Sequence, residues 1–317
     1  MFRPPFRSGK PPMNRAFLGW VDEQKVKPSS LVVPRHNPAE GRAHLAATWN
    51  RSAGVSPHVL IVGATGGGKS SLVRLATLDL VREKRKARER LDLTIIDGAG
   101  AGEYTFLRSV PGVEIINSND DAHPGSVKVA AEALRLAIEK VITRNADLEK
   151  AQDEAERTRR TPTYEPPTEL IIVIDEWMAL MWDFAHILGA KAQRQAIGQA
   201  IQIGRLGRKV STHLVIATQR PDATSDDAGL PGELKAQLGC RIAAVGPLGM
   251  LPIESLMCFG DGDTGQLAPA TLGGCVMRVG NTKVPFVAPK MVDPTTVDRS
   301  VTDEERAAVW SMLPKVV

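Results

Sequence analysis

The sequence is poor in aromatic residues, which make up only 4% of its 317 positions. This scarcity argues against a base-stacking surface or a lectin-like site. Cysteine is scarce too: Cys240, Cys258 and Cys275 lie too far apart for a C-x-x-C metal pair, and their odd number argues against a disulfide framework. We expect all three to be small buried apolar residues in a reducing compartment.

Long apolar runs are also missing. The most apolar stretch, 170–181, is interrupted by Asp175 and Glu176, so no run has the length of a bilayer span. The basic first fifteen residues have no apolar core of signal-peptide length. We therefore expect a cytoplasmic protein, unless membrane-associated partner proteins hold it at a bilayer. The net charge of +4 permits binding to nucleic acid without requiring it.

The most informative run that is present extends from Gly63 to Ser70. It fits the phosphate-binding pattern G-x-x-x-x-G-K-[ST] and follows an apolar run at 59–62. Its glycines let backbone N–H groups converge on phosphate oxygens, and the N-terminus of the following helix favours the anion. Lys69 would add positive charge at the terminal phosphates, and Ser70 would offer a hydroxyl to Mg²⁺. The predicted nucleotide site comprises Gly63, Ala64, Thr65, Gly66, Gly67, Gly68, Lys69, Ser70 and Ser71.

A second apolar run, 170–174, ends in two acids. We expect this strand to lie beside the strand of the phosphate loop, so that Asp175 reaches the Mg²⁺ through its water shell. Glu176 would polarise a water for in-line attack on the γ-phosphate. The alternative is a strand that simply ends in a polar turn.

A third segment, 203–221, has the pattern of a basic helix end followed by a strand with a polar tip. Thr218 and Gln219 at that tip would face the γ-phosphate. Arg205 and Arg208 precede the strand, at the opposite edge of the sheet. There a cation can reach a neighbouring subunit's site and stabilise charge in the transition state. The alternative for both arginines is pairing with surface acids.

The alternation of strand-like and helix-like patterns predicts an α/β fold with a mostly parallel sheet and helices on both faces. Residues 1–16 should form a disordered basic arm, either for nucleic acid or for solubility. A short lead-in with one or two elements is expected over 17–54, and a tail over 291–317. Expected elements are strands at 58–62, 93–96, 170–174, 213–218, 241–245 and 275–279, helices at 69–90, 126–150 and 303–312, and an exposed loop at 151–168.

The chain resembles the motor domain of the FtsK/SpoIIIE family of ring-forming DNA translocases. The matching runs are Pro57–Ser70, Ile172–Glu176, Gly207–Arg208 and the run HLVIATQRP at His213–Pro221. The resemblance implies a RecA-like P-loop domain over 55–290, with ATP and Mg²⁺ as cofactors. It also implies a homo-oligomeric, hexameric ring around double-stranded DNA. The catalytic roles that it implies fall on Lys69, Asp175, Glu176, Gln219, Arg208 and Arg205; Arg144 also stands where the family has an arginine.

The sequence departs from the family pattern at two places. Asp97–Gly100 stands where members often have Asp-Pro-Lys, so that lysine is missing. Pro247–Ser255 stands where the family has an Asp-Ser-Arg segment, which leaves the coupling between subunits open. No membrane-spanning start and no winged-helix domain are visible, and we expect a compact motor similar to the conjugation proteins of actinobacterial plasmids.

The leading functional hypothesis is an ATP-dependent double-stranded DNA translocase, for conjugative plasmid transfer or chromosome partition. Protein export by type VII secretion is an alternative, because those ATPases also resemble this family. A nucleotide-gated DNA-binding assembly protein is a third. DNA contacts should be mainly to phosphates, with segments 183–194 and 222–235 as candidates.

Overall fold

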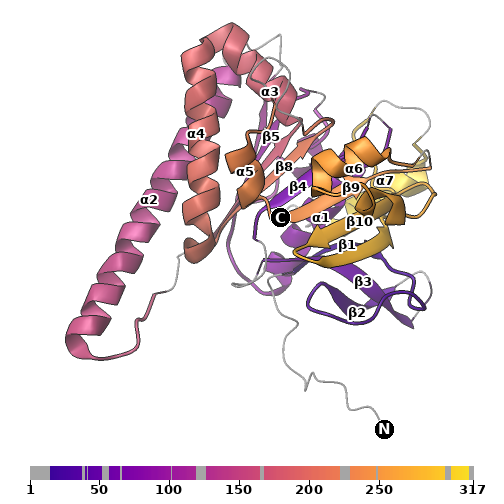
Figure 1. The fold of residues 1–317 in the computed structure, drawn as a ribbon, viewed down its shortest axis with the longest axis horizontal. Helices are drawn as coiled ribbons and strands as arrows, with labels where there is room; N and C mark the ends of the chain where they lie inside the picture. Colours follow the sequence, from indigo (N-terminus) through magenta and orange to yellow (C-terminus); the bar gives the residue numbers. More distant parts are fainter. Residues whose placement is uncertain are drawn as a thin grey trace.

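The computed structural model describes residues 15–37, 40, 42–51, 57–64, 66–100, 102–118, 126–164, 168–221, 229–247, 249–296 and 301–313. Their strands form one eleven-stranded sheet in the order β2-β3-β1-β11-β10-β9-β4-β8-β7-β5-β6 (Figure 1). The sheet has a parallel half, which carries the predicted site, and an antiparallel half.

The parallel half contains the strands that were expected to carry the motifs. Its members all run in one direction, so their carboxyl ends share one edge of the sheet. One expectation about their order is wrong: β8 lies between the phosphate-loop strand β4 and the acid-bearing strand β7. In sheet order the strands are β9 (Cys240–Ala244), β4 (Val59–Val62), β8 (Thr212–Thr218), β7 (Glu169–Asp175), β5 (Leu91–Asp97) and β6 (Val113–Asn117).

The antiparallel half extends the sheet beyond β9. The lead-in at 17–54 contributes three strands rather than one or two elements, and they join the main sheet. Residues 1–14 of the predicted arm lie outside the described residues, whereas Arg15 and Ala16 already belong to β1. The strands are β10 (Gly274–Val279), β11 (Thr282–Val287), β1 (Arg15–Trp20), β3 (Arg42–Asn50) and β2 (Val32–Asn37).

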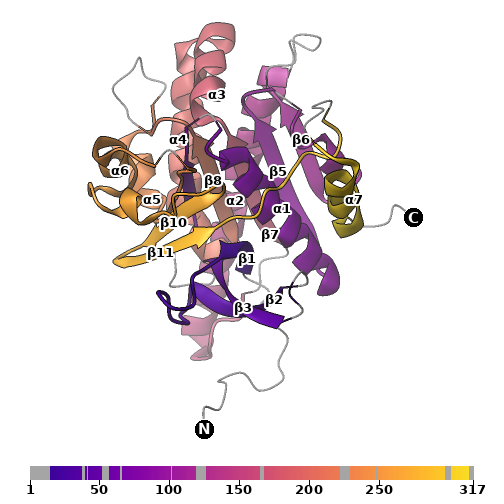
Figure 2. The same ribbon diagram turned by 90° about the vertical axis from the view of Figure 1, so that its right-hand side faces the viewer.

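Helices cover both faces of the sheet, as predicted (Figures 1 and 2). Alternate strand residues point to opposite faces, so two separate cores form. In one, α1 (Lys69–Lys86) and Val309 of α7 (Asp303–Met312) pack with Ile61 and Val173. In the other, Leu60 and Ile172 pack against helices on the second face. Those helices are α2 (Ser126–Thr158), α3 (Trp177–Asp183), α4 (Ala190–Leu206), α5 (Gly232–Gln237) and α6 (Pro252–Phe259).

The boundaries of two helices differ from expectation. Helix α2 continues to Thr158, through a stretch predicted to be loop, because residues 151–158 are mostly good helix formers and Arg157 pairs with Glu154 one turn away. Helix α1 ends at Lys86 rather than near residue 90, and Arg88 then takes a left-handed conformation, with φ of 56°. The C-terminal helix has the predicted bounds and a Thr302–Glu305 capping box.

The remaining short elements are the single turns η1 (Thr105–Leu107), η3 (Gly207–Val210) and η4 (Thr264–Leu267), and the π-helical turn η2 (Phe184–Leu188). The three cysteines are buried and free, as expected. None of the helices in the described ranges combines the length and apolar character that a bilayer span requires.

Candidate functional site

The phosphate loop connects β4 to α1 at the carboxyl edge of the parallel strands. Gly67 packs against the end of β9 so closely that a Cβ there would lie 2.6 Å from the Ala244 carbonyl oxygen. Gly66 and Gly68 have φ of +79° and +93°, which residues with a side chain rarely adopt. The loop geometry therefore needs glycine at these positions. Thr65, also predicted here, lies outside the described residues.

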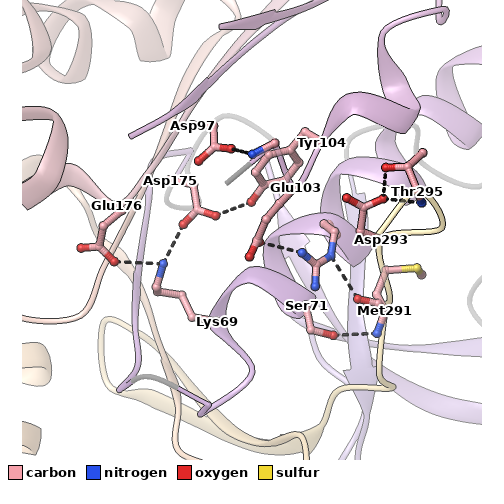
Figure 3. A network of polar contacts seen from close by, with 12 residues as sticks. Lys69, Ser71, Asp97, Glu103, Tyr104, Asp175, Glu176, Met291, Asp293 and Thr295 are labelled. Atoms are coloured by element: carbon pink, nitrogen blue, oxygen red, sulfur yellow. Dashed lines mark hydrogen bonds and ion pairs between the residues drawn. The ribbon is translucent and has the colours of Figure 1, made fainter. Parts of the chain in front are cut away.

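Lys69, Asp175 and Glu176 meet at this edge, although they come from two separate parts of the chain (Figure 3). The Lys69 Nζ atom lies 2.7 Å from Asp175 Oδ1 and 3.3 Å from Glu176 Oε2. All three residues are buried. Burial lowers the pKa of Lys69, but the two carboxylates outweigh this effect, so the pKa is raised and the ammonium stays charged. The predicted catalytic cation and acids thus form one cluster.

Glu176 has a left-handed backbone conformation, with φ of 64° and ψ of 70°. This conformation costs a non-glycine residue roughly 1–2 kcal/mol, and such strain is concentrated at functional sites. Its Oε1 atom accepts hydrogen bonds from the Thr218 hydroxyl at 3.4 Å and the Gln219 backbone N–H at 3.3 Å. The tip of β8 therefore contacts the acid that is predicted to activate water.

Tyr104 is a site residue that the sequence did not reveal. It is fully buried just before η1, and its hydroxyl donates a hydrogen bond of 2.5 Å to Asp175 Oδ2. Burial, together with the Asp175 carboxylate, raises the pKa of Tyr104 well above its usual value, so the hydroxyl remains a donor. Asp175 is thus held on both oxygens, by Lys69 and by Tyr104. No motif surrounds Tyr104, so no sequence signal marked it.

Asp97 ends β5 beside Asp175 and organises the turn that departs from the family pattern. Its carboxylate accepts hydrogen bonds from the backbone N–H groups of Gly100 at 3.0 Å and Gly102 at 2.9 Å. Burial and the nearby Asp175 charge raise its pKa to about 6. A Cβ on Gly98 would lie 2.5 Å from the Glu176 carbonyl oxygen, so only glycine fits directly after Asp97.

The predicted Mg²⁺ ligands have suitable chemistry. Ser70 follows Lys69 in the first turn of α1, and its hydroxyl and the Asp175 carboxylate are hard oxygen ligands that Mg²⁺ prefers, alongside phosphate and water. Bound Mg²⁺ would neutralise phosphate charge at this edge. Ser71 differs, because its Oγ atom accepts a hydrogen bond of 2.6 Å from the Met291 N–H (Figure 3). A role of Ser71 in nucleotide binding would therefore fall to its backbone N–H.

The arginines lie as predicted, at the amino edge of the parallel strands. Arg205 lies in the last turn of α4 and Arg208 lies in η3, just before β8; both are exposed. Within the described part of the chain, neither forms an ion pair. Arg144 instead is buried and donates hydrogen bonds to the Val210 carbonyl at 3.2 Å and the Thr212 hydroxyl at 3.4 Å. These contacts brace the turn that carries Arg208.

A cavity of about 270 Å³ adjoins the phosphate loop. The loop residues Gly63 and Ala64 form one wall, and Gln219 forms part of another. The remaining lining is largely apolar and comes mainly from the end of β9, from α6 with Met257, and from the connection before α6 with Met250. A concave site with an apolar wall beside a phosphate loop suits the sugar and base of a nucleotide.

Comparison with known proteins places these features in a family. The FtsK/SpoIIIE family profile matches residues 20–223. The EccC protein of the ESX secretion system of Thermomonospora curvata is 28% identical over 296 residues, which is 90% of this chain and 20% of that protein. The DNA translocase FtsK of Streptomyces coelicolor is 28% identical over 202 residues, or 59% of this chain and 20% of that protein.

Solved structures show the same fold. The conjugation coupling protein TcpA of pCW3, in a monomer form with ATPγS, superposes with a TM-score of 0.60 at 19% identity, covering 93% of this chain and 74% of that one. The cytoplasmic domain of T. curvata EccC gives 0.57 at 23% identity, covering 91% and 32%. The chain spans about a fifth of the length of the curated relatives named above. The profile match, together with the phosphate loop and the paired acids beside it, shows that this chain belongs to the FtsK/SpoIIIE family of P-loop ATPases.

Proposed function

We propose that the protein is an ATPase that moves double-stranded DNA through a homo-oligomeric ring. The observation that carries the ATPase part is the cluster of Lys69, Asp175 and Glu176 at the phosphate loop, with the tip of β8 in contact with Glu176. In this proposal Lys69 contacts the terminal phosphates and Asp175 acts on the Mg²⁺ side. Glu176 activates the attacking water, and Gln219 responds to the γ-phosphate.

The ring part of the proposal rests on Arg208, with Arg205 as the second candidate. Both are exposed on the sheet edge opposite the phosphate loop, so they cannot serve their own nucleotide site. An arginine in this position can complete the site of a neighbouring copy and stabilise transition-state charge there. The likeness to FtsK translocases and to TcpA supports DNA as the transported polymer, for transfer between cells or for chromosome partition.

Export of protein is the second candidate, and one observation favours it. The similarity to EccC covers 90% of this chain, against 59% for FtsK of S. coelicolor. The two functions differ in what stimulates hydrolysis. We expect long duplex DNA to raise steady-state ATP hydrolysis of the purified chain, with Lys69→Ala as the blank. Hydrolysis that is indifferent to DNA but rises with a helical secretion substrate would replace translocation by export.

Mixing two inactive variants tests the role of Arg208. Lys69→Ala removes a chain's own site, and Arg208→Ala removes the residue proposed to act on its neighbour. A ring containing both has some interfaces where an intact Lys69 meets an intact Arg208. We therefore expect the mixture to regain DNA-stimulated hydrolysis that each variant lacks alone. Full activity of Arg208→Ala by itself, or no recovery on mixing, would remove Arg208 from this role.

A further inference from the structure

The segment from Phe184 to Arg220 contains no aspartate or glutamate, although acids are frequent elsewhere in the chain. Its basic residues are Lys191, Arg194, Arg205, Arg208, Lys209 and Arg220. The longest element of this segment is helix α4, which packs on α2 on the outside of the molecule (Figure 1). A segment with only positive charge attracts an anionic partner.

The charges and amides of α4 occupy one side of the helix. Lys191, Arg194, Gln195 and Gln202 are exposed, and with Gly198 they recur every three or four residues. The opposite side, which includes Ala196, Ala200 and Ile203, is buried in the core. We call the exposed side, from Lys191 to Gln202, the α4 face. It continues in the same direction to Arg205 and Lys209, and the stretch from Lys191 to Arg205 is roughly 21 Å long.

The basic residues of the α4 face are not neutralised by neighbours. Lys191 and Arg194 form no ion pair with any residue that the structure describes. Helix α2 shows the contrasting case. Its exposed Lys140 pairs with Asp92 at 2.8 Å and its Lys150 with Asp147 at 3.2 Å. The α4 face therefore presents free positive charge, whereas the charges of Lys140 and Lys150 on α2 are already paired.

Gly198 lies in the middle of the α4 face, and packing does not require it. A Cβ there would meet no atom within 4 Å, whereas a Cβ on Gly204 would approach Gln237 to 2.8 Å. Glycine inside a helix is destabilising relative to alanine. Its lack of a side chain instead lets a partner's backbone approach the helix closely. Gly198 thus supports direct contact with an extended partner rather than long-range attraction alone.

We infer that the α4 face contacts the phosphate backbone of double-stranded DNA; this inference rests on the proposed function. Lysine, arginine and glutamine are side chains that commonly contact DNA phosphates. Duplex DNA carries one negative charge per ~1.7 Å of axis, so a face of this length lies opposite many phosphates. A second copy of this chain is the competing occupant, but the segment offers it no acid with which to form reciprocal ion pairs.

The test measures binding of a fluorescent duplex to the full chain by anisotropy, with ATPγS and Mg²⁺, at several salt concentrations. Lys191→Gln with Arg194→Gln removes two proposed phosphate contacts. The matched control, Lys140→Gln with Lys150→Gln, removes two charges from α2. Gly198→Leu adds bulk to the α4 face without changing its charge. Hydrolysis without DNA serves as the folding check for every variant.

We expect the α4 charge variant to bind at least ten-fold more weakly at 0.1 M salt. The slope of log affinity against log salt should become shallower by about 1.8, since each contact contributes about 0.9. Gly198→Leu should weaken binding with the slope unchanged, and the α2 control should bind like the wild type. Equal losses in the α4 and α2 charge variants would overturn the inference. So would normal DNA affinity combined with weaker self-association in sedimentation, because the face would then be a subunit contact. A wild-type chain that binds no duplex would instead refute the proposed function.

Discussion

Replacing Tyr104 by phenylalanine tests whether a buried hydroxyl positions the acid of the nucleotide site. Asp175 is almost completely buried, with the Lys69 ammonium on one carboxylate oxygen and the Tyr104 hydroxyl on the other. Tyr104→Phe keeps the ring in its place and removes only the second donor. Of these two contacts, the Asp175 carboxylate then keeps only its ion pair with Lys69. It can rotate about its Cβ–Cγ bond and is no longer held in one orientation.

The size of the effect follows from the charge and burial of Asp175. A hydrogen bond to a charged group contributes about 1.5–3 kcal/mol. Loss of a group that orients a metal ligand lowers metal affinity or activity about 10- to 100-fold. These two estimates agree, since 1.4 kcal/mol corresponds to a factor of about ten. We therefore expect Tyr104→Phe to need about 10- to 100-fold more free Mg²⁺ for half-maximal ATP hydrolysis.

The assay is a titration of hydrolysis against free Mg²⁺ at saturating ATP. The chain supplies a matched control, because it has only one other tyrosine, Tyr164. The Tyr164 hydroxyl is buried without a hydrogen-bond partner in the described structure, so Tyr164→Phe should leave the titration unchanged. If folded Tyr104→Phe also gives an unchanged Mg²⁺ titration, Tyr104 does not position Asp175, and this interpretation of their hydrogen bond is wrong.

Two further predictions concern the buried charges at the amino edge of the sheet. Glu169→Gln should destabilise the fold by about 3–5 kcal/mol in urea unfolding, because it removes the buried carboxylate that Arg51 and Lys84 share and leaves Lys84 with only the more exposed Glu89; the surface control Glu132→Gln should match the wild type. Burial, and then the charge of His213, lowers the pKa of His58 to about 3. The folded state therefore binds fewer protons than the unfolded state below pH ~6.5, and stability should fall by roughly 2 kcal/mol between pH 6.5 and 4.5. His58→Asn keeps an acceptor for the Leu214 N–H and should lose this part of the pH dependence; identical pH profiles for variant and wild type would contradict the assignment.

The sequence predicted the residues of the site better than it predicted the order of the strands in the sheet. The phosphate loop, the two acids after β7 and the polar tip of β8 each combine a local pattern with a strand end, so their shared edge could be foreseen. The order of the strands could not, because β7 and β8 are both apolar runs and nothing local says which pairs with β4. Tyr104 was missed for a related reason: its contact with Asp175 joins residues 71 positions apart.

The antiparallel half was predicted only in part: the strand at 275–279 was expected and is β10, whereas β1, β2, β3 and β11 were not identified as strands. β1 pairs with β11, far along the chain, and a strand of six residues carries a weak periodic signal. The C-terminal helix, in contrast, has a capping box in its own sequence, and its bounds were predicted correctly. The C-terminal helix could thus be predicted from its own start signal, whereas β1 depends on a partner far along the chain.

Strand β8 has a mechanical consequence. One end contacts Glu176 through Thr218 and Gln219, and the other follows directly after the turn that carries Arg208. All seven residues of the strand are buried, and the strand pairs with β4 on one side and β7 on the other, over roughly 23 Å. Because it is paired on both sides along its length, we expect the strand to move as a rigid unit. A displacement of its tip at the nucleotide site would therefore move the end near Arg208 as well. If the chain forms the proposed ring, this strand would carry the state of one subunit's site to its neighbour.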